Sequence, residues 1–267
     1  MGQFAGTGWL GDAACFNHDT LLLQSNDLDE VRARVADVFK PHRLTLTGHS
    51  CALHSRMHHA RWGNLSLNLL DYGGEVSIEP GPLEHFYLLQ IPLRGDAEIE
   101  CGTTRFVSSP DTASLLSPTL PLRMRWGDAC PQVILRIERE VMERHAQRHF
   151  GDDRRAPVEF EPEFRLSSPQ GACLAQMLPM LADAIATDGH PLRHPLAFEQ
   201  LESTLLNLLL YGQPNSARNG ARVAPAPLAP FYVRRVEEYI RTHVDEPLTI
   251  ERLAELAGVS PSTLFAG

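Results

Sequence analysis

Hydrophobic and polar residues alternate along much of the first half of the chain. Apolar side chains occupy every second position over Leu65–Leu69, Ala97–Cys101 and Val133–Ile137, a spacing typical of half-buried antiparallel strands. Turn-forming residues such as Pro80-Gly81-Pro82 separate these stretches at short intervals. The pattern therefore predicts a small β-barrel or sandwich over residues of about 40–140.

From residue 141 the hydrophobic positions follow a helical period. The predicted helices are Asp27–Phe39 ahead of the strands, and Val141–Phe150, Cys173–Ala186 and Leu196–Tyr211 after them. Pro179 is expected to kink the helix that contains it. Barrel and helices together predict one domain over residues 1–211, with helices over 141–211.

The helix predicted over Leu196–Tyr211 is apolar over more of its surface than one neighbour covers. Such a face indicates a surface for a partner, and a helix buried inside its own domain is the alternative. The candidate dimerisation residues are Leu201, Leu205, Leu206 and Leu209.

Residues 212–230 lack any apolar period and contain four prolines and two glycines in 19 positions. This composition predicts a flexible linker.

Helical patterning resumes over residues 231–267. A short helix that starts near Thr249 ends at Gly258, the small residue that a left-handed helix end needs. Ser260 and Pro261 then form a good N-cap and first-turn pair for a further helix. This spacing is typical of a helix-turn-helix, and an ordinary pair of antiparallel helices is the alternative.

Composition narrows the classes of function. The chain has 267 residues, of which 43% are hydrophobic and 21% charged, so it is long enough for proper cores and is not mainly disordered. Lysines and arginines total 24, with Lys40 the only lysine, against 33 acids. The net charge of -9 requires any DNA contact to be local.

The chain carries no sign of secretion or of membrane insertion. Its five cysteines are widely spaced without a Cys-x-x-Cys pair, which indicates reduced thiols. The N-terminus lacks the pattern of a signal peptide, and no apolar stretch is long enough to span a membrane. We therefore expect a soluble, cytoplasmic protein with no membrane partner.

The segment LTIERLAELAGVSPSTLF, residues 248–265, resembles the first helix-turn-helix of the AraC/XylS transcriptional regulators. The preceding RRVEEYIRTHVDEPL resembles that family's first helix. Upstream, YLLQIPLRGDAEIECG, SSPDTASLLSP and LRMRWGDACPQVILRIERE are similar to the cupin-like sensing domain of regulators of aromatic-compound catabolism. LESTLLNLLLYGQPNS resembles the helix by which that subgroup dimerises.

The resemblance implies an α+β protein. Its parts would be a cupin-like antiparallel β-barrel with a helical dimerisation segment, and then an all-α helix-turn-helix domain. The implied partners are a small-molecule effector held in the barrel, a second copy of the chain and operator DNA, with RNA polymerase as a further contact. The implied function is effector-responsive transcriptional regulation.

The DNA-binding domain of this family contains two helix-turn-helix units, and residues 231–267 match only part of the first. The positions that correspond to base and phosphate contacts are Ser260, Ser262, Thr263, Phe265 and Ala266. Most of these are poor hydrogen-bonding partners for bases. The segment also has four arginines against six acids, so we expect the 267-residue chain to bind DNA weakly or not at all.

An aromatic or carboxylate effector needs an apolar slot with a cationic or hydrogen-bonding anchor. The candidate effector-binding residues are Arg61, Tyr72, Tyr87, Arg94 and Trp126, with Phe86 and Arg125 as further candidates. Alternation fixes which residues share a face of a strand, but not which face looks inward.

Two patterns suggest enzyme chemistry. Residues Gly48–Ala52 resemble the nucleophile elbow of an α/β-hydrolase but lack its second glycine. The metal-like cluster of His54, His58, His59, His85 and Glu84 does not have the spacing of a catalytic cupin. We expect no catalytic residue, metal or cofactor, and a metal-dependent cupin enzyme and a dimerisation-only module stay as alternatives.

Overall fold

The computed structural model describes residues 7–48, 53–151, 157–220, 236, 239–240 and 249–260. The chain divides into two compact units, residues 1–221 and 222–267.

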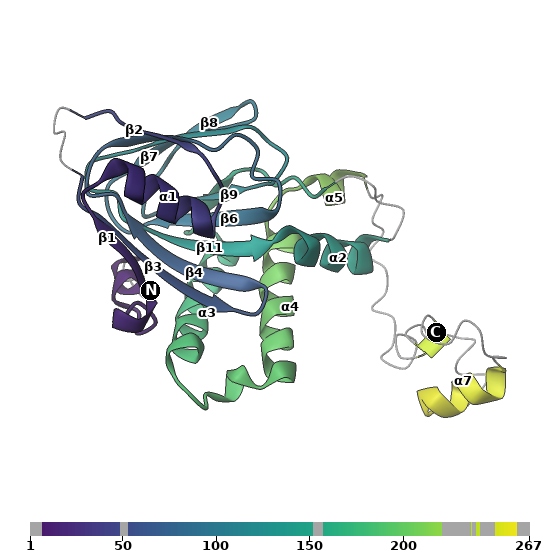
Figure 1. The fold of residues 1–267 in the computed structure, drawn as a ribbon. Helices are drawn as coiled ribbons and strands as arrows, with labels where there is room; N and C mark the ends of the chain where they lie inside the picture. The colour runs from purple at the N-terminus through teal and green to yellow at the C-terminus, as the bar shows by residue number, and fades with distance from the viewer. Residues whose placement is uncertain are drawn as a thin grey trace. The chain divides into compact units, whose positions relative to one another are not determined.

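The described strands of the first unit form two antiparallel sheets that face each other (Figure 1). The larger sheet has the order β1-β3-β4-β11-β6-β9-β12, and the smaller sheet has the order β2-β5-β10-β7-β8. The larger sheet contains β1 (Leu21–Ser25), β3 (Ser55–Trp62), β4 (Leu65–Asp71), β6 (Phe86–Pro92), β9 (Thr112–Leu116), β11 (Gln132–Glu138) and β12 (Glu163–Arg165). The smaller sheet contains β2 (Arg43–Leu46), β5 (Val76–Glu79), β7 (Ala97–Cys101), β8 (Thr104–Ser108) and β10 (Leu122–Trp126).

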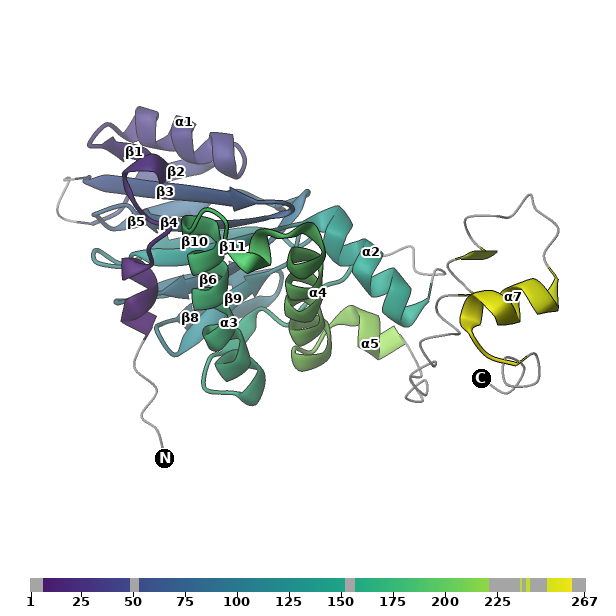
Figure 2. The same ribbon diagram turned by 90° about the horizontal axis from the view of Figure 1, so that it is seen from below.

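The helices lie on two sides of this sandwich. Helices α3 and α4 cover the outer face of the larger sheet (Figures 1 and 2). Helix α1 packs against β1 and β2, which are edge strands of the larger and the smaller sheet, and its Val31 and Val35 are buried in the core between the sheets. The α-helices are α1 (Leu28–Val38), α2 (Arg139–Phe150), α3 (Pro169–Ala186), α4 (Pro195–Gly212) and α5 (Ser216–Gly220). Short 3₁₀ helices are η1 (Thr7–Asp12), η2 (His18–Thr20) and η3 (Pro191–Arg193). The predicted α+β class, with an antiparallel cupin-like barrel, is confirmed.

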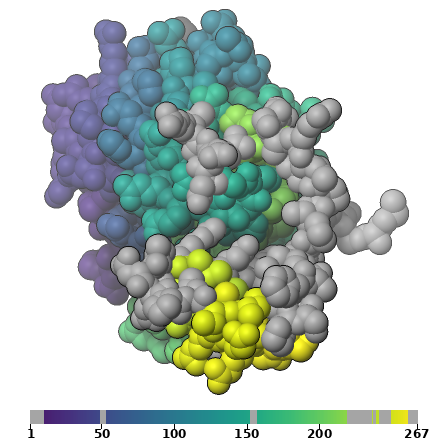
Figure 3. Space-filling view, turned by 90° about the vertical axis from the view of Figure 1, so that its right-hand side faces the viewer, coloured from purple at the N-terminus to yellow at the C-terminus, as the bar shows by residue number. Residues whose placement is uncertain are grey.

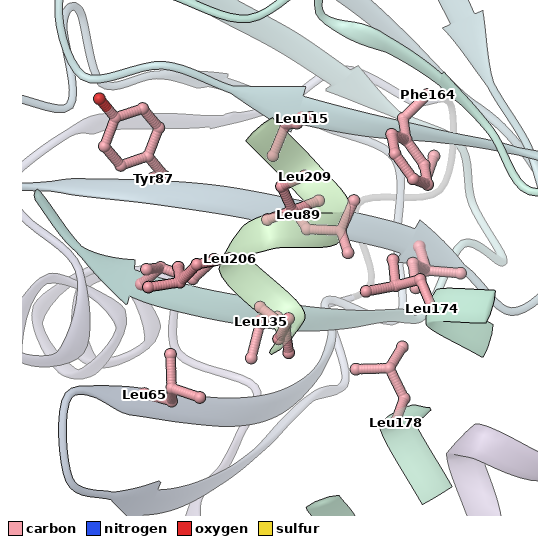
Figure 4. Close-up of a cluster of buried hydrophobic side chains, with 14 of the residues drawn as sticks. Leu65, Tyr87, Leu89, Leu115, Leu135, Phe164, Leu174, Leu178, Leu206 and Leu209 are labelled. Carbon is pink, nitrogen blue, oxygen red and sulfur yellow. The ribbon is translucent and has the colours of Figure 1, made fainter. Parts of the chain in front are cut away.

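The larger sheet is buried on both faces, because the smaller sheet covers one face and the helices cover the other. Successive side chains of a strand point to opposite faces, so each strand contributes to both cores. All seven residues of β6 are buried. Leu88 and Ile134 point between the sheets, into what we term the inner core. Leu89 and Leu135 point toward the helices, into the outer core (Figure 4).

The predicted helices are found within a few residues of their expected ends. Helix α1 begins at Leu28 because the Asp27 carboxylate accepts hydrogen bonds from the backbone N–H groups of Asp29 and Glu30, both at 2.9 Å. Helix α3 begins four residues before the predicted Cys173, since Ser168 caps it by accepting from the Gly171 N–H at 3.1 Å. Pro179 lies inside α3, which continues through it.

The leucines expected to form a dimer surface mostly face the chain's own core. Leu205, Leu206 and Leu209 are buried in the outer core, where Leu206 and Leu209 lie over the larger sheet (Figure 4). Leu201 is half-buried at its edge. The apolar face of α4 is therefore used within the domain, which corresponds to the alternative interpretation of this helix.

The segment expected to be a linker, residues 212–230, begins differently from that expectation. Gln213 and Asn215 are buried, and the Gln213 amide donates to the backbone carbonyls of Glu161 and Glu163 at 2.7 and 2.9 Å. Helix α5 lies beside α2 (Figures 1 and 3). Composition alone missed this because side-chain amides, rather than an apolar period, hold the segment in place.

In the second unit, helix α7 (Ile250–Ala257) is capped by the Thr249 hydroxyl, which accepts from the Arg252 N–H at 3.3 Å. It ends at Gly258, whose φ of +67° is left-handed. Both ends of this helix are where the sequence predicted them.

Replacement of Leu209 by Ala should lower the free energy of unfolding by about 2–5 kcal/mol, because it opens a cavity in the outer core. Leu196, on the same helix and 66% exposed, is the matched control, and its replacement by Ala should cost about 1 kcal/mol or less. Urea denaturation of the two variants checks this. Equal losses of stability would contradict the assignment of α4's buried face.

Candidate functional site

A cavity of about 40 Å³ lies in the inner core between the two sheets. This is room for a few water molecules. Its wall combines residues of both sheets with the C-terminal end of α1. A ligand of drug-like size needs roughly 300 Å³ or more, so side chains must move apart for such a ligand to enter.

The wall of this inner cavity is largely apolar. Its apolar side chains are Val35, Phe39, Leu70, Ile78, Pro80, Leu83, Leu88, Met124 and Ile134. Its polar or amphipathic side chains are Lys40, His42, Tyr72, Gln90 and Trp126. An apolar slot with a few polar groups is typical of a site for a small organic molecule.

Two polar atoms on this wall lack a hydrogen-bond partner among the described residues: Nε1 of Trp126 and Nε2 of His42. Trp126 is only 2% exposed. The other ring nitrogen of His42, Nδ1, lies 2.9 Å from the Lys40 carbonyl oxygen. Because a carbonyl can only accept, Nδ1 carries the proton and Nε2 is left as an acceptor. The wall thus presents one unsatisfied donor and one unsatisfied acceptor.

Burial lowers the pKa of His42, and the positive charge of Arg32 adds to the effect. The neutral form of the ring is therefore favoured. In that form Nε2 can accept a hydrogen bond from a ligand hydroxyl.

Two of the five predicted effector residues line this cavity. The rings of Tyr72 and Trp126 meet edge to face with centroids 5.3 Å apart. Tyr87 lies on the opposite face of the larger sheet, where its hydroxyl donates to the Val158 carbonyl at 2.9 Å and its ring packs on Phe160. Tyr87 therefore belongs to the outer core, as alternation along β6 requires.

The two predicted arginine anchors also lie elsewhere. Arg61 is exposed in a polar groove beside α2. Arg94 is exposed and lies 3.6 Å from the carboxylate of Asp71. The sequence could not show which cationic side chain lies on the wall of the inner cavity, because strand alternation does not orient residues at strand ends and in loops.

Sequence reasoning missed Lys40, His42 and Gln90, which line the cavity. Lys40 is the only lysine in the chain, and its place directly after the first predicted helix was the available signal.

The histidines of the metal-like cluster have separate surroundings. His58 is buried near Phe16, with ring centroids 5.9 Å apart. His59 lies 2.6 Å from the Asn68 side-chain oxygen, and His54 lies 2.9 Å from that of Asn26. Over the described parts of the chain, no group of three or more His, Cys, Asp or Glu residues comes together as a metal site.

Several of the predicted site residues lie outside the described parts of the chain. Ser260 is described and exposed. Ser262, Thr263, Phe265 and Ala266 are outside the described residues, as are His49–Ala52 of the elbow-like segment. None of the helices in the described regions is long and apolar enough to cross a membrane.

Residues 31–211, which contain the barrel and its helical layer, match the model of the AraC-binding-like domain family. The chain belongs to this family. The matched residues of this AraC-binding-like domain extend from within α1 to the last turn of α4, and they include every residue that lines the inner cavity.

Relatives of this AraC-binding-like chain are described as an operon regulatory protein and an operon transcriptional activator. A probable thc operon regulatory protein of Rhodococcus erythropolis is 28% identical over 247 residues, covering 91% of this chain and 74% of the relative. A XylDLEGF operon transcriptional activator of Pseudomonas putida is 26% identical over 211 residues, covering 79% of this chain and 63% of the relative. The chain thus spans about three quarters of the first relative and less than two thirds of the second.

The fold also matches the crystal structure of the AraC-like transcriptional activator CuxR. The TM-score is 0.52 at 15% identity, and the match covers 91% of this chain and 86% of CuxR.

The stability of this AraC-binding-like domain should fall as the pH drops below about 6.5. Burial lowers the pKa of His42, His58 and His145. Below the pKa of histidine in the unfolded chain, these side chains therefore bind more protons in the unfolded chain than in the folded chain. The folded state is fully stabilised above that pKa and loses this stabilisation as the pH falls.

Replacement of His42 by Asn should reduce this slope, and urea denaturation at several pH values between about 5 and 7.5 measures it. The control is His18→Asn, at a side chain that is 98% exposed, which should keep the slope. If the unfolding free energy of the His42 variant changes with pH as steeply as that of the unmodified chain, burial of His42 does not contribute to the pH dependence.

Proposed function

We propose that this chain belongs to a DNA-binding, effector-responsive transcriptional regulator, and that the inner cavity is its effector site. The main support for the site is that Trp126 Nε1–H and His42 Nε2, on a largely apolar wall, have no hydrogen-bond partner among the described residues. A buried polar group without a partner costs about 1–3 kcal/mol. An oxygen-bearing ligand removes that cost by supplying the missing partners.

The regulatory role is supported by the relatives, which are described as an operon regulatory protein and an operon transcriptional activator. Because the chain spans only part of their length, DNA binding and contact with RNA polymerase are proposals for the whole protein. A cytoplasmic location goes with them, since the operator DNA is there.

The effector we propose is a small aromatic or carboxylate compound. The apolar wall suits a flat or branched hydrocarbon body, and Lys40 is the cation among the described residues of the wall. Since the cavity has room for only a few water molecules, the effector must widen it. Val35 of α1 and Phe39, which directly follows α1, belong to the wall that must move. An effector that binds the widened state better than the closed one shifts the balance between them.

A homodimer is the proposed assembly, and the outward face of α3 and α4 is its proposed surface. A groove there is lined by residues that include Cys173, Leu208 and Tyr211. Met180 and Tyr211 are 49% and 47% exposed. The predicted Leu205, Leu206 and Leu209 would then support the dimer from the core side instead of contacting the partner.

We propose a regulator and not an enzyme. The described residues that line the cavity include no carboxylate and no histidine besides His42. They therefore do not form a carboxylate pair for acid–base chemistry or a histidine–carboxylate set for a metal.

Replacement of Trp126 by Phe should weaken the binding of an oxygen-bearing aromatic ligand by up to about tenfold, the value of one hydrogen bond. Isothermal titration with a panel of aromatic acids and phenols checks this. The matched control is Trp62→Phe, because Trp62 packs on Phe198 in the outer core, with centroids 4.3 Å apart. If both variants bind alike, Trp126 does not recognise the ligand.

The regulatory function is tested by an electrophoretic mobility shift with DNA from upstream of the protein's own gene. Two proteins are compared: this 267-residue chain and the chain extended by the C-terminal residues of the Rhodococcus relative. We expect only the extended chain to shift DNA, and both to elute as dimers in size-exclusion chromatography. Dimers that never bind DNA would support a dimerisation-only module, and a metal-loaded monomer would support a cupin enzyme.

A further inference from the structure

Lys40 connects the inner cavity to the loop between β5 and β6. Its side chain lines the cavity wall and is only 19% exposed. The Lys40 ammonium donates to the Pro82 carbonyl at 2.6 Å and to the Glu84 carboxylate at 2.7 Å. The charge on the wall is therefore already matched by a carboxylate of the chain itself.

Glu84 has an unusual backbone conformation. Its φ is +68°, and among the described residues no other non-glycine residue has a positive φ. A residue with a Cβ is uncommon there and is held by its surroundings. The Glu84 N–H donates to the Pro118 carbonyl at 2.8 Å. The loop thus presents this carboxylate to Lys40 at some conformational cost.

The two partners of the ion pair differ in their access to water. The Glu84 side chain is 56% exposed and the Lys40 side chain 19%. If Glu84 leaves, water can solvate its carboxylate, and the neighbouring His85 ring, 3.9 Å away, offers a second partner when it is protonated. Lys40, at the cavity wall, would still require an anion. An exchange of one carboxylate for another therefore leaves every charge satisfied.

We propose that Glu84 is a built-in substitute for the carboxylate of the effector, and that the effector is an apolar monocarboxylate whose carboxylate displaces Glu84 from Lys40. This proposal rests on the proposed function, because it assumes that the inner cavity binds the effector. It names Lys40 as the anion anchor, in place of Arg61 and Arg94, which do not line the cavity. Arg125 is likewise not the anchor, since it does not line the cavity.

The same loop is bonded to the first residue of α2. The Arg139 guanidinium donates to the Glu84 carbonyl at 3.0 Å, and the Arg139 N–H donates to the His85 carbonyl at 2.9 Å. Arg139 also pairs with Glu143 on the next turn at 2.7 Å. Release of the Glu84 side chain from Lys40 therefore loosens the loop that supports the start of α2.

Helix α2 in turn contacts α4 and α5. His145 of α2 lies 2.9 Å from the Asn207 side-chain oxygen of α4, and α2 lies beside α5. Helix α5 is the last element before residue 221, where the first unit ends. Displacement of Glu84 would thus transmit the presence of the effector from the cavity to the end of the sensing unit.

The experiment measures binding of paired acids and amides, namely benzoate with benzamide and phenylacetate with phenylacetamide, by isothermal titration. The 267-residue chain is compared with Glu84→Gln, Lys40→Met and Lys40→Arg, after thermal melts show that each is folded. Glu84→Gln should bind an acid about tenfold more tightly, since the internal competitor has lost its charge. Lys40→Met should lose the preference for the acid over its amide, and Lys40→Arg should restore it.

The matched control is Glu79→Gln. Glu79 pairs with Arg123, at 3.7 Å, outside the cavity, so its replacement should leave acid binding within about twofold. Amide hydrogen exchange supplies the second measurement. Acids should speed exchange in the first turn of α2 in the unmodified chain, and Glu84→Gln should show the faster exchange without ligand.

The outcomes separate this proposal from the proposed function. If acids and amides bind equally well to the unmodified chain and to Lys40→Met, the cavity binds ligands but the exchange with Glu84 is wrong. If no acid or amide binds any of the proteins, both the exchange and the use of the cavity for this class of ligand are overturned. The exchange would be supported if Glu84→Gln binds acids more tightly and Lys40→Met no longer prefers the acid over its amide.

Discussion

The fold depends on the larger sheet being buried on both faces. Along β6, Leu88 and Gln90 point into the inner cavity, while Tyr87 and Leu89 point into the outer core. One strand thus contributes both to a wall of the candidate effector site and to the surface against which the helices pack. A change in spacing between the sheets therefore acts on the same strands that carry α2, α3 and α4.

The wall of the inner cavity carries buried polar atoms without partners and one end of an ion pair. Buried polar atoms normally have hydrogen-bond partners, yet Trp126 Nε1 and His42 Nε2 have none among the described residues. Lys40 is satisfied, but by a carboxylate that is largely in water. A core selected only for stability would favour apolar residues at these positions, so the arrangement supports the proposal that the cavity binds a ligand.

The position of Lys40 gives this arrangement a route to the rest of the domain. The Glu84 segment touches Lys40 on one side and Arg139 on the other. Its left-handed backbone at Glu84 is the kind of strain that persists where the surrounding structure fixes it and that is often found at switch regions. The physical element with two states is the ammonium of Lys40, which binds either an internal or an external carboxylate.

The local elements and the family could be predicted from the amino-acid sequence alone. Period two indicated the strands, period 3.6 indicated the helices, and Asp27, Thr249 and Gly258 set helix ends, because these features depend on neighbouring residues. Which face of each element is used depends instead on the tertiary structure. Only the packing of two sheets and a helical layer puts Tyr72 and Trp126 in the cavity but Tyr87 outside it. The same packing buries Leu206 and Leu209 in the domain's own core, and brings Lys40 to Glu84, 44 positions away in the chain. Those contacts join residues that are distant in sequence, and a local pattern carries no information about which of them meet.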